Sequence, residues 1–172
     1  MSKDAMRLVA FSSLLLAAVL PLTTQARTSD RNAPMDVEAD STDAMLGDDS
    51  DAILSGNVRI TQGTLAVGAD KAVIHRKNGD IDKVTLTGSP ATLKQISDIG
   101  EPMNAQASQI VYTLSSDLVV LTGGVVVQQP RGTLRGETIK YDLKSGHLDG
   151  GGDGKRVQMR IMPKNKTVGG TN

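Results

Sequence analysis

The stretch at residues 56–70 reads GNVRITQGTLAVGAD, and apolar and polar residues alternate on both sides of Gly63. Alternation with a period of two is typical of a β-strand with one buried face, and a glycine between two such runs is typical of a turn. A related stretch, GGVVVQQPRGTLRGETIKYD, follows at residues 123–142. One hairpin needs no such repetition, so the two stretches indicate repeated hairpins that stack on one another.

The repeat extends over most of the chain. Glycine-led runs begin at Gly56, Gly88 and Gly123, which are 32 and 35 residues apart. A turn and a second alternating strand are expected after each run, the second strands at residues 68–75, 104–112 and 136–141. VEAD at residues 37–40 resembles VGAD at 67–70, which predicts a partial fourth unit at the start of the domain.

Residues that favour turns separate the expected short strands. They are NGD at 78–80, GSP at 88–90, TGG at 122–124 and KSG at 144–146. Asn-Gly is the strongest hairpin signal among them. DGGGDG at 149–154 is expected to be a flexible hinge, and VQMRIM at 157–162 a last strand. The sequence therefore predicts an all-β domain, built as two facing sheets or as one folded sheet.

The expected interior is aliphatic. The chain has no tryptophan, its one phenylalanine is Phe11, and Tyr112 and Tyr141 are its two tyrosines. Because large aromatics usually supply much of the buried area of a globule, their scarcity favours a thin, repetitive core. Such a core can fill itself completely, or it can leave a methyl-lined slot for a hydrocarbon chain, where each buried CH₂ contributes about 0.8 kcal/mol.

The alternation also predicts which side chains face inward. This inward set is Val58, Ile60, Leu65, Val67, Val84, Leu86, Leu93, Val119, Leu121, Val125, Val127, Leu134 and Ile139. A shift of one residue in register would turn the residues of any one strand outward.

The first 26 residues have the pattern of a secretory signal. Lys3 and Arg7 precede an apolar run, and small and polar residues end at Ala26, after which we expect cleavage. An uncleaved anchor is the alternative, although the run is short for a membrane span. The remaining chain of about 146 residues suits one domain over residues 27–162, followed by a flexible tail at 163–172.

Charge is balanced overall but unevenly distributed. The formal net charge is zero, so nothing indicates binding to nucleic acid. Residues 28–51 hold eight acids and one base, whereas residues 155–172 hold five bases and no acid. The two ends are either solvated independently or attract one another between copies of the chain.

No motif in the sequence indicates catalysis or a cofactor. His75 and His147 lie far apart in sequence, and without cysteine there is no thiolate nucleophile or soft metal site. DDSD at 48–51 lacks the alternating oxygens and the glycine of a calcium loop. GGGDGK at 150–155 lacks both the leading glycine and the final Ser or Thr of a phosphate loop. We expect no enzyme activity, metal or cofactor.

The glycine-led units resemble those of the OstA/LptA family of periplasmic lipopolysaccharide-transport proteins. The first unit fits with Gly56, Asn57, Val58, Ile60, Gln62, Gly63, Ala69 and Asp70. A later element fits with Leu121, Thr122, Gly123, Val125, Val127 and Gln129, with Gly124 where the family more often has Asn. IKYD at 139–142 and VEAD at 37–40 also match, so the resemblance covers about residues 35–148.

The resemblance implies a twisted β-jellyroll of stacked antiparallel strands with open ends, likened to a folded taco. It implies that copies join edge to edge into a bridge that carries lipopolysaccharide from the inner to the outer membrane, with the lipid A acyl chains inside. The implied partners are LptC of the inner-membrane LptBFGC complex and LptD at the outer membrane. The terminal units, near residues 36–40 and 157–162, would make the protein contacts.

The resemblance also gives the inward set a role, as the lining of a lipid groove. Arg59, Lys71 and Arg76 would contact lipid phosphates at the rim, unless they are simply solvated. The rival hypotheses are a structural β-repeat scaffold of the cell envelope without lipid cargo, and a cell-envelope enzyme that acts on glycans, which has no catalytic constellation to support it.

Overall fold

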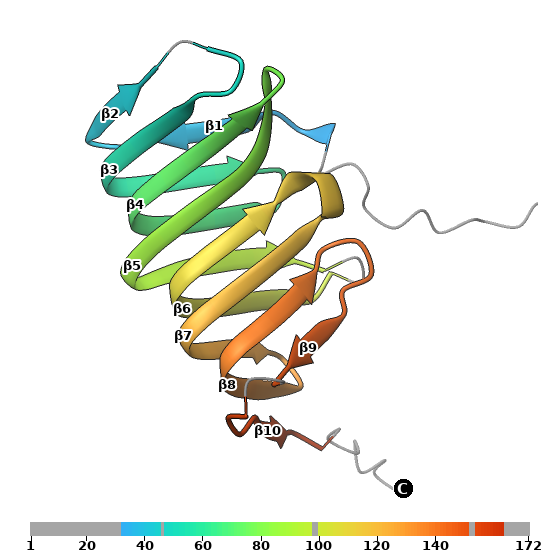
Figure 1. The fold of residues 1–172 in the computed structure, drawn as a ribbon. Helices are drawn as coiled ribbons and strands as arrows, with labels where there is room; N and C mark the ends of the chain where they lie inside the picture. The colour runs from blue at the N-terminus through green and yellow to red at the C-terminus, as the bar shows by residue number, and fades with distance from the viewer. Residues whose placement is uncertain (1–31, 46, 98–99, 152–153, 164–172) are drawn as a thin grey trace, which may run out of the picture.

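The computed structural model describes residues 32–45, 47–97, 100–151 and 154–163, and these residues are almost entirely β-structure (Figure 1). The strands are β1 (Met35–Glu38), β2 (Ser41–Ala44), β3 (Asp51–Gln62), β4 (Leu65–Lys77), β5 (Asp80–Ile96), β6 (Pro102–Thr113), β7 (Leu118–Gln129), β8 (Gly132–Asp142), β9 (Leu148–Gly150) and β10 (Gln158–Ile161). A short 3₁₀ turn, η2 (Leu114–Ser116), joins β6 to β7.

The strands form one antiparallel sheet in the order β1-β3-β4-β5-β6-β7-β8-β10. Two short strands complete its edges, since β2 also pairs with β3 and β9 also pairs with β8. From β3 to β8 each strand pairs with the next one along the chain, so successive hairpins stack as the repeat predicts (Figure 1). Because β1 and β10 do not pair with one another, the sheet stays open at both ends.

Every long strand bends at its middle, and the bends line up into one corner that runs along the sheet. The pairing register shifts there between all neighbouring pairs from β3–β4 to β7–β8. Such irregularities are β-bulges, which sharpen the local bend and twist of a strand. One sheet therefore folds over on itself, which decides between the two arrangements that the sequence left open.

The corner corrects two of the expected turns. GSP at 88–90 lies inside β5 and TGG at 122–124 lies inside β7, so the predicted short strands are halves of long bent ones. Gly56 and Gly123 have φ of 78° and 86° at the corner, in the left-handed region where glycine is favoured. The glycines that define the repeat mark bends in alternate strands, and they do not start strands.

The corner divides the sheet into two arms. Arm A consists of β2, β9 and the strand halves 51–55, 71–77, 80–87, 109–113, 118–122 and 138–142. Arm B consists of β1, β10 and the strand halves 58–62, 65–68, 91–96, 102–107, 125–129 and 132–136. The arms face one another, and the hairpin tips of each arm form its lip, the edge away from the corner.

Of the remaining local predictions, some are confirmed and one is partly wrong. Asn78-Gly79 is the two-residue turn between β4 and β5, with φ of 53° and 86° as in a type I′ hairpin. The KSG turn at 144–146 and the last strand are confirmed as well. The expected hinge is wrong at Asp149 and Gly150, which pair with β8 as part of β9. The predicted signal and residues 164–172 of the predicted tail lie outside the described residues.

Candidate functional site

The space between the arms is lined by the alternate, inward-facing side chains of β3 to β8. All thirteen residues of the predicted inward set are buried, with exposed fractions from 0 to 8 %. Where two of them share a strand half, one outward-facing residue separates them, for example Arg59 between Val58 and Ile60. Their contact with a lipid stays a prediction.

Eleven further residues are buried that the sequence pattern did not predict. They are Leu54, Ala72, Ile74, Ala91, Met103, Ala105, Ala107, Ile110, Tyr112, Tyr141 and Leu143. The signal was present in β6, where Met103, Ala105 and Ala107 alternate with polar residues. Alanine contributes so little to apolar contrast that this alternation is weak in the sequence.

The interior is filled by its own side chains. The cavity between the arms measures only about 10 Å³, and residues of both arms line it, among them Ile60 and Leu93 of arm B and Leu86 and Tyr112 of arm A. A cavity of this size is at the lower limit for a single water molecule. At this place the side chains of the two arms pack closely, so the middle of the interior is filled by the chain itself.

The C-terminal end of the interior is less closed. A hollow of about 220 Å³ lies there, lined by Val127 and Leu134 from the long strands and by Leu148, Met159 and Ile161 from the short ones. All four residues of β10 are exposed, including both apolar ones. At the other end, Met35 and Val37 of β1 are half-buried against the core.

The three predicted phosphate-contacting cations are exposed but are not brought together. Arg59 is on the outer face of arm B, Lys71 follows the corner in arm A, and Arg76 lies near the β4–β5 turn, where its Nη2 donates to the Gly79 carbonyl oxygen at 2.8 Å. Arg59 instead shares a surface hollow of about 340 Å³ with Lys94. Lys94 was missed, although its outward position follows from its place after the buried Leu93.

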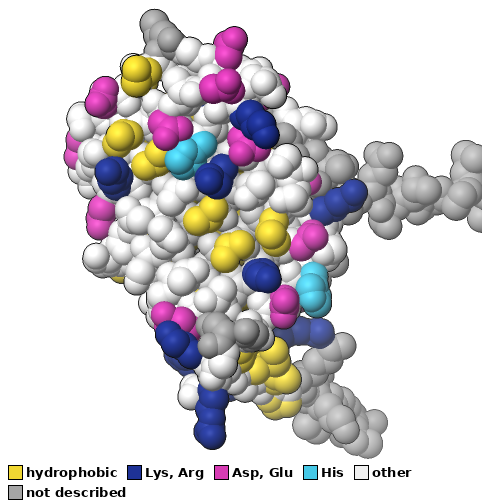
Figure 2. Space-filling view, viewed as in Figure 1, with side chains coloured by type: hydrophobic (Ala, Val, Ile, Leu, Met, Phe, Trp, Pro, Cys, Tyr) yellow, Lys and Arg dark blue, Asp and Glu magenta, His cyan; other side chains and the backbone are white. Residues whose placement is uncertain are grey.

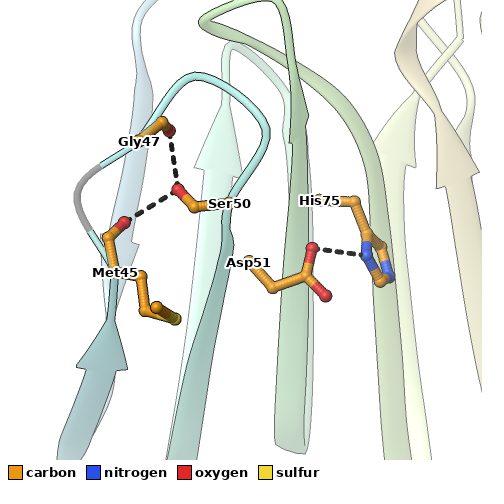
Figure 3. Close-up of polar contacts among 5 residues, drawn as sticks. All are labelled: Met45, Gly47, Ser50, Asp51 and His75. Atoms are coloured by element: carbon orange, nitrogen blue, oxygen red, sulfur yellow. Dashed lines mark hydrogen bonds and ion pairs between the residues drawn. The ribbon is translucent and has the colours of Figure 1, made fainter.

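The histidines also lie apart, and His75 has a local structural role (Figure 3). Its Nδ1 lies 2.9 Å from Asp51 Oδ1, which joins the start of β3 to β4. Ser50 Oγ lies 2.8 Å from the Met45 carbonyl oxygen and 2.7 Å from that of Gly47, which ties the chain before β3 into a compact turn (Figure 3). These contacts fasten the lip of arm A at its N-terminal end.

The ionisable groups of the described residues lie on the surface. No polar or charged residue among them is buried, and no group of three or more His, Asp or Glu is placed to hold a metal ion. The pKa of Asp142 is held below its usual 3.8, chiefly because the Ser145 backbone N–H donates to its carboxylate. This carboxylate lies in an exposed turn.

Within the described part of the chain, no helix has the length and apolar character needed to cross a membrane.

Comparison with known proteins identifies relatives over nearly the whole chain. The family model described as LptA/(LptD N-terminal domain) LPS transport protein matches residues 36–147. The lipopolysaccharide export system protein LptA of Escherichia coli (strain K12) is 36% identical over 165 residues, covering 94% of this chain and 87% of that protein. LptA of Haemophilus influenzae is 31% identical over 164 residues, covering 92% of this chain and 95% of that protein.

A solved structure agrees in fold. LptH, described as the LptA homologous periplasmic component of the lipopolysaccharide transport device of Pseudomonas aeruginosa, superimposes with a TM-score of 0.70 at 30% identity. The match covers 78% of this chain and 99% of that one, so the folded, open β-jellyroll is shared. The family model, the curated relatives and the common fold together establish that this chain belongs to the LptA family of lipopolysaccharide transport proteins.

Proposed function

We propose that this chain binds lipopolysaccharide in the periplasm and carries it from the inner to the outer membrane, with the lipid A acyl chains held between arm A and arm B. The observation that carries the proposal is the inner face of the folded sheet. It is an apolar surface from β3 to β8, and no charged residue is buried among the described residues. Each CH₂ group buried against it contributes about 0.8 kcal/mol.

Since the interior is filled in this structure, cargo enters only when the arms move apart about the corner. Separation exposes the apolar side chains that the arms bury against each other, and the acyl chains bury them again. The gain from the cargo is therefore offset by the lost contact between the arms. The resulting affinity is moderate, which suits a carrier that must pass its cargo on.

The open edges of the sheet support a chain of carriers. The outer edges of β1 and β10 have no neighbouring strand among the described residues, and unpaired edges add strands from other proteins. Acidic side chains gather at the N-terminal end, and Lys and Arg side chains are seen at the C-terminal end (Figure 2). Lys155, Arg156 and Arg160 are exposed residues of the C-terminal segment. We propose that copies join end to end, that one end of the assembly meets LptC and that the other end meets LptD.

Photo-crosslinking in cells tests the cargo. A photoreactive residue at Val58, Ile60 or Val127 is expected to form adducts with lipopolysaccharide, because these side chains face the space between the arms. The exposed neighbour Arg59 provides the matched control on the same strand. Adducts confined to Arg59, or no adducts at all, would favour the cargo-free scaffold.

Self-association is tested at the exposed C-terminal strand. The double change Met159→Ser and Ile161→Ser is expected to shift the purified protein towards monomer in analytical ultracentrifugation, because both side chains are exposed apolar residues on the edge strand. The exposed Met45 near the other end provides a control, Met45→Ser. An unchanged sedimentation profile of the double variant would place the contact elsewhere.

A further inference from the structure

The inner face is not apolar all the way to its lip. On arm B, Gln62, Gln95 and Gln129 occupy the same place in β3, β5 and β7, near the ends of these strands. Each lies two residues beyond a buried aliphatic residue, so its side chain projects to the same inner side of the sheet. We call these three residues the glutamine ladder.

The strand register aligns the ladder. The buried residues that precede it belong to one cross-strand row, in which Ile60 pairs with Val67, Val67 with Leu93, Leu93 with Ala105 and Ala105 with Val127. Successive glutamines are therefore two strands apart, about 9–10 Å. On the intervening strands, Gln62 pairs with Leu65 and Gln95 with Met103. Amide and apolar side chains thus alternate along the lip.

Gln95 is the unusual member. Its Oε1 is buried and accepts no hydrogen bond from any described residue. A buried amide oxygen without a donor is destabilising, and proteins hold few such atoms. The other two glutamines of the ladder differ from Gln95. Gln62 donates from Nε2 to the Ala33 carbonyl oxygen at 3.2 Å, and Gln129 borders the hollow at the C-terminal end. The structure therefore has an acceptor at the lip that a ligand can satisfy.

We infer that the glutamine ladder binds the amide and hydroxyl groups at the polar ends of the cargo's acyl chains. The inference rests on the proposed function, since it assigns a contact to the same interior. The lip is where the apolar space meets solvent, so the junction between acyl chain and sugar lies there. A glutamine amide both donates and accepts hydrogen bonds, which matches amide and hydroxyl groups. Across the interior, arm A places Tyr112, whose ring combines an apolar body with a polar tip.

The test replaces Gln95 by the similarly sized Met, which removes the acceptor. Displacement of a bound fluorescent alkyl probe is measured with two competitors. They are lipopolysaccharide, whose acyl chains carry amide and hydroxyl donors, and methyl myristate, which carries neither. Gln95→Met is expected to weaken competition by lipopolysaccharide about 3–10-fold, the range of one lost hydrogen bond. Competition by methyl myristate is expected to stay unchanged.

Two further measurements separate the ladder from a purely structural effect. The melting temperature of free Gln95→Met is expected to rise, because the variant no longer buries an unpaired oxygen. Gln106→Met, at an exposed outer position of β6, is the matched control and is expected to leave both competitors unaffected.

The possible results distinguish the two proposals. Equal weakening of both competitors, or no weakening of lipopolysaccharide, would overturn the ladder and leave the proposed function standing. If lipopolysaccharide does not displace the probe from the wild-type chain, the proposed function is overturned, and the ladder with it.

Discussion

Arm A and arm B face one another across the same interior, yet they contribute different side chains to it. Arm A buries both tyrosines and three isoleucines, Ile74, Ile110 and Ile139. Arm B buries three alanines, Ala91, Ala105 and Ala107, and carries the glutamine ladder at its lip. Both arms also bury leucines and valines, so each supplies bulk to a core nearly without aromatics. The arms therefore differ in their remaining buried residues and in the polar lip, and separation of the arms is the step that we expect to admit cargo.

The largest effect is expected from removing bulk on arm A. Ile110 is completely buried, so Ile110→Ala should lower the free energy of unfolding by about 2–5 kcal/mol through lost contacts and a cavity. Urea unfolding measures the loss. The exposed Gln109 on the same strand is the control, and Gln109→Ala should change stability by less than about 0.5 kcal/mol. Equal losses would show that the inner face of arm A is not packed as described.

The corner that joins the arms is expected to be nearly as sensitive. Gly123 has φ of 86°, and a Cβ there would lie 2.8 Å from the Ser108 Cβ. Its neighbour Gly124 has φ of 59° and open space around its Cβ position. Gly124→Ala should therefore lower the free energy of unfolding only by the cost of a left-handed alanine, about 1–2 kcal/mol. Gly123→Ala should lower the free energy of unfolding further. Equal destabilisation of the two variants in thermal unfolding would contradict the crowding at the corner.

Adding bulk on arm B tests the packing of the interior from the opposite side. Ala105→Leu inserts three carbon atoms opposite a filled arm A, which should cost about 1–3 kcal/mol by overpacking. The same variant should bind lipopolysaccharide more weakly, because the added side chain competes for the space of the acyl chains. Gln106→Leu on the outer face is the control. Stronger lipopolysaccharide binding by Ala105→Leu would place the cargo elsewhere.

The smallest effect is expected at the β8–β9 turn of arm A. The backbone N–H groups of Ser145 and Lys144 lower the pKa of Asp142 from its usual 3.8. A carboxylate with a lowered pKa in the folded state stabilises the protein above the unfolded value, and this contribution is lost as the pH falls through the folded pKa. Asp142→Asn should therefore flatten the decline of stability below about pH 4. An unchanged acid limb in urea unfolding would show that the turn contributes nothing.

Much of this fold follows from the sequence because its period of two is a local property. The alternation at Val58 and Ile60, or at Val125 and Val127, already fixes which side chains share a face. The corner does not follow, because glycine permits both a turn and a bulge, and only strand pairing places Gly88 and Gly123 inside long strands. The packing of the interior does not follow either, since it depends on how the two arms face one another across the corner.

The same distinction between local pattern and three-dimensional packing applies to the site. The outward position of Lys94 and the inward position of Gln95 follow from the alternation along β5. The unpaired Oε1 of Gln95 is a property of packing in three dimensions. Repetition of glutamine at strand ends is visible in the sequence. Its alignment into one ladder requires the register of five strands.

Separation of the arms on binding is tested most directly by a distance between them. Because the chain has no cysteine, Asp80→Cys and Lys94→Cys place two spin labels on exposed sites of β5, on either side of the corner. Double electron–electron resonance is recorded with and without lipopolysaccharide. We expect the distance between the two labels to grow by about 4 Å or more, the thickness of one inserted layer of carbon atoms. Binding of lipopolysaccharide with an unchanged distance would contradict it.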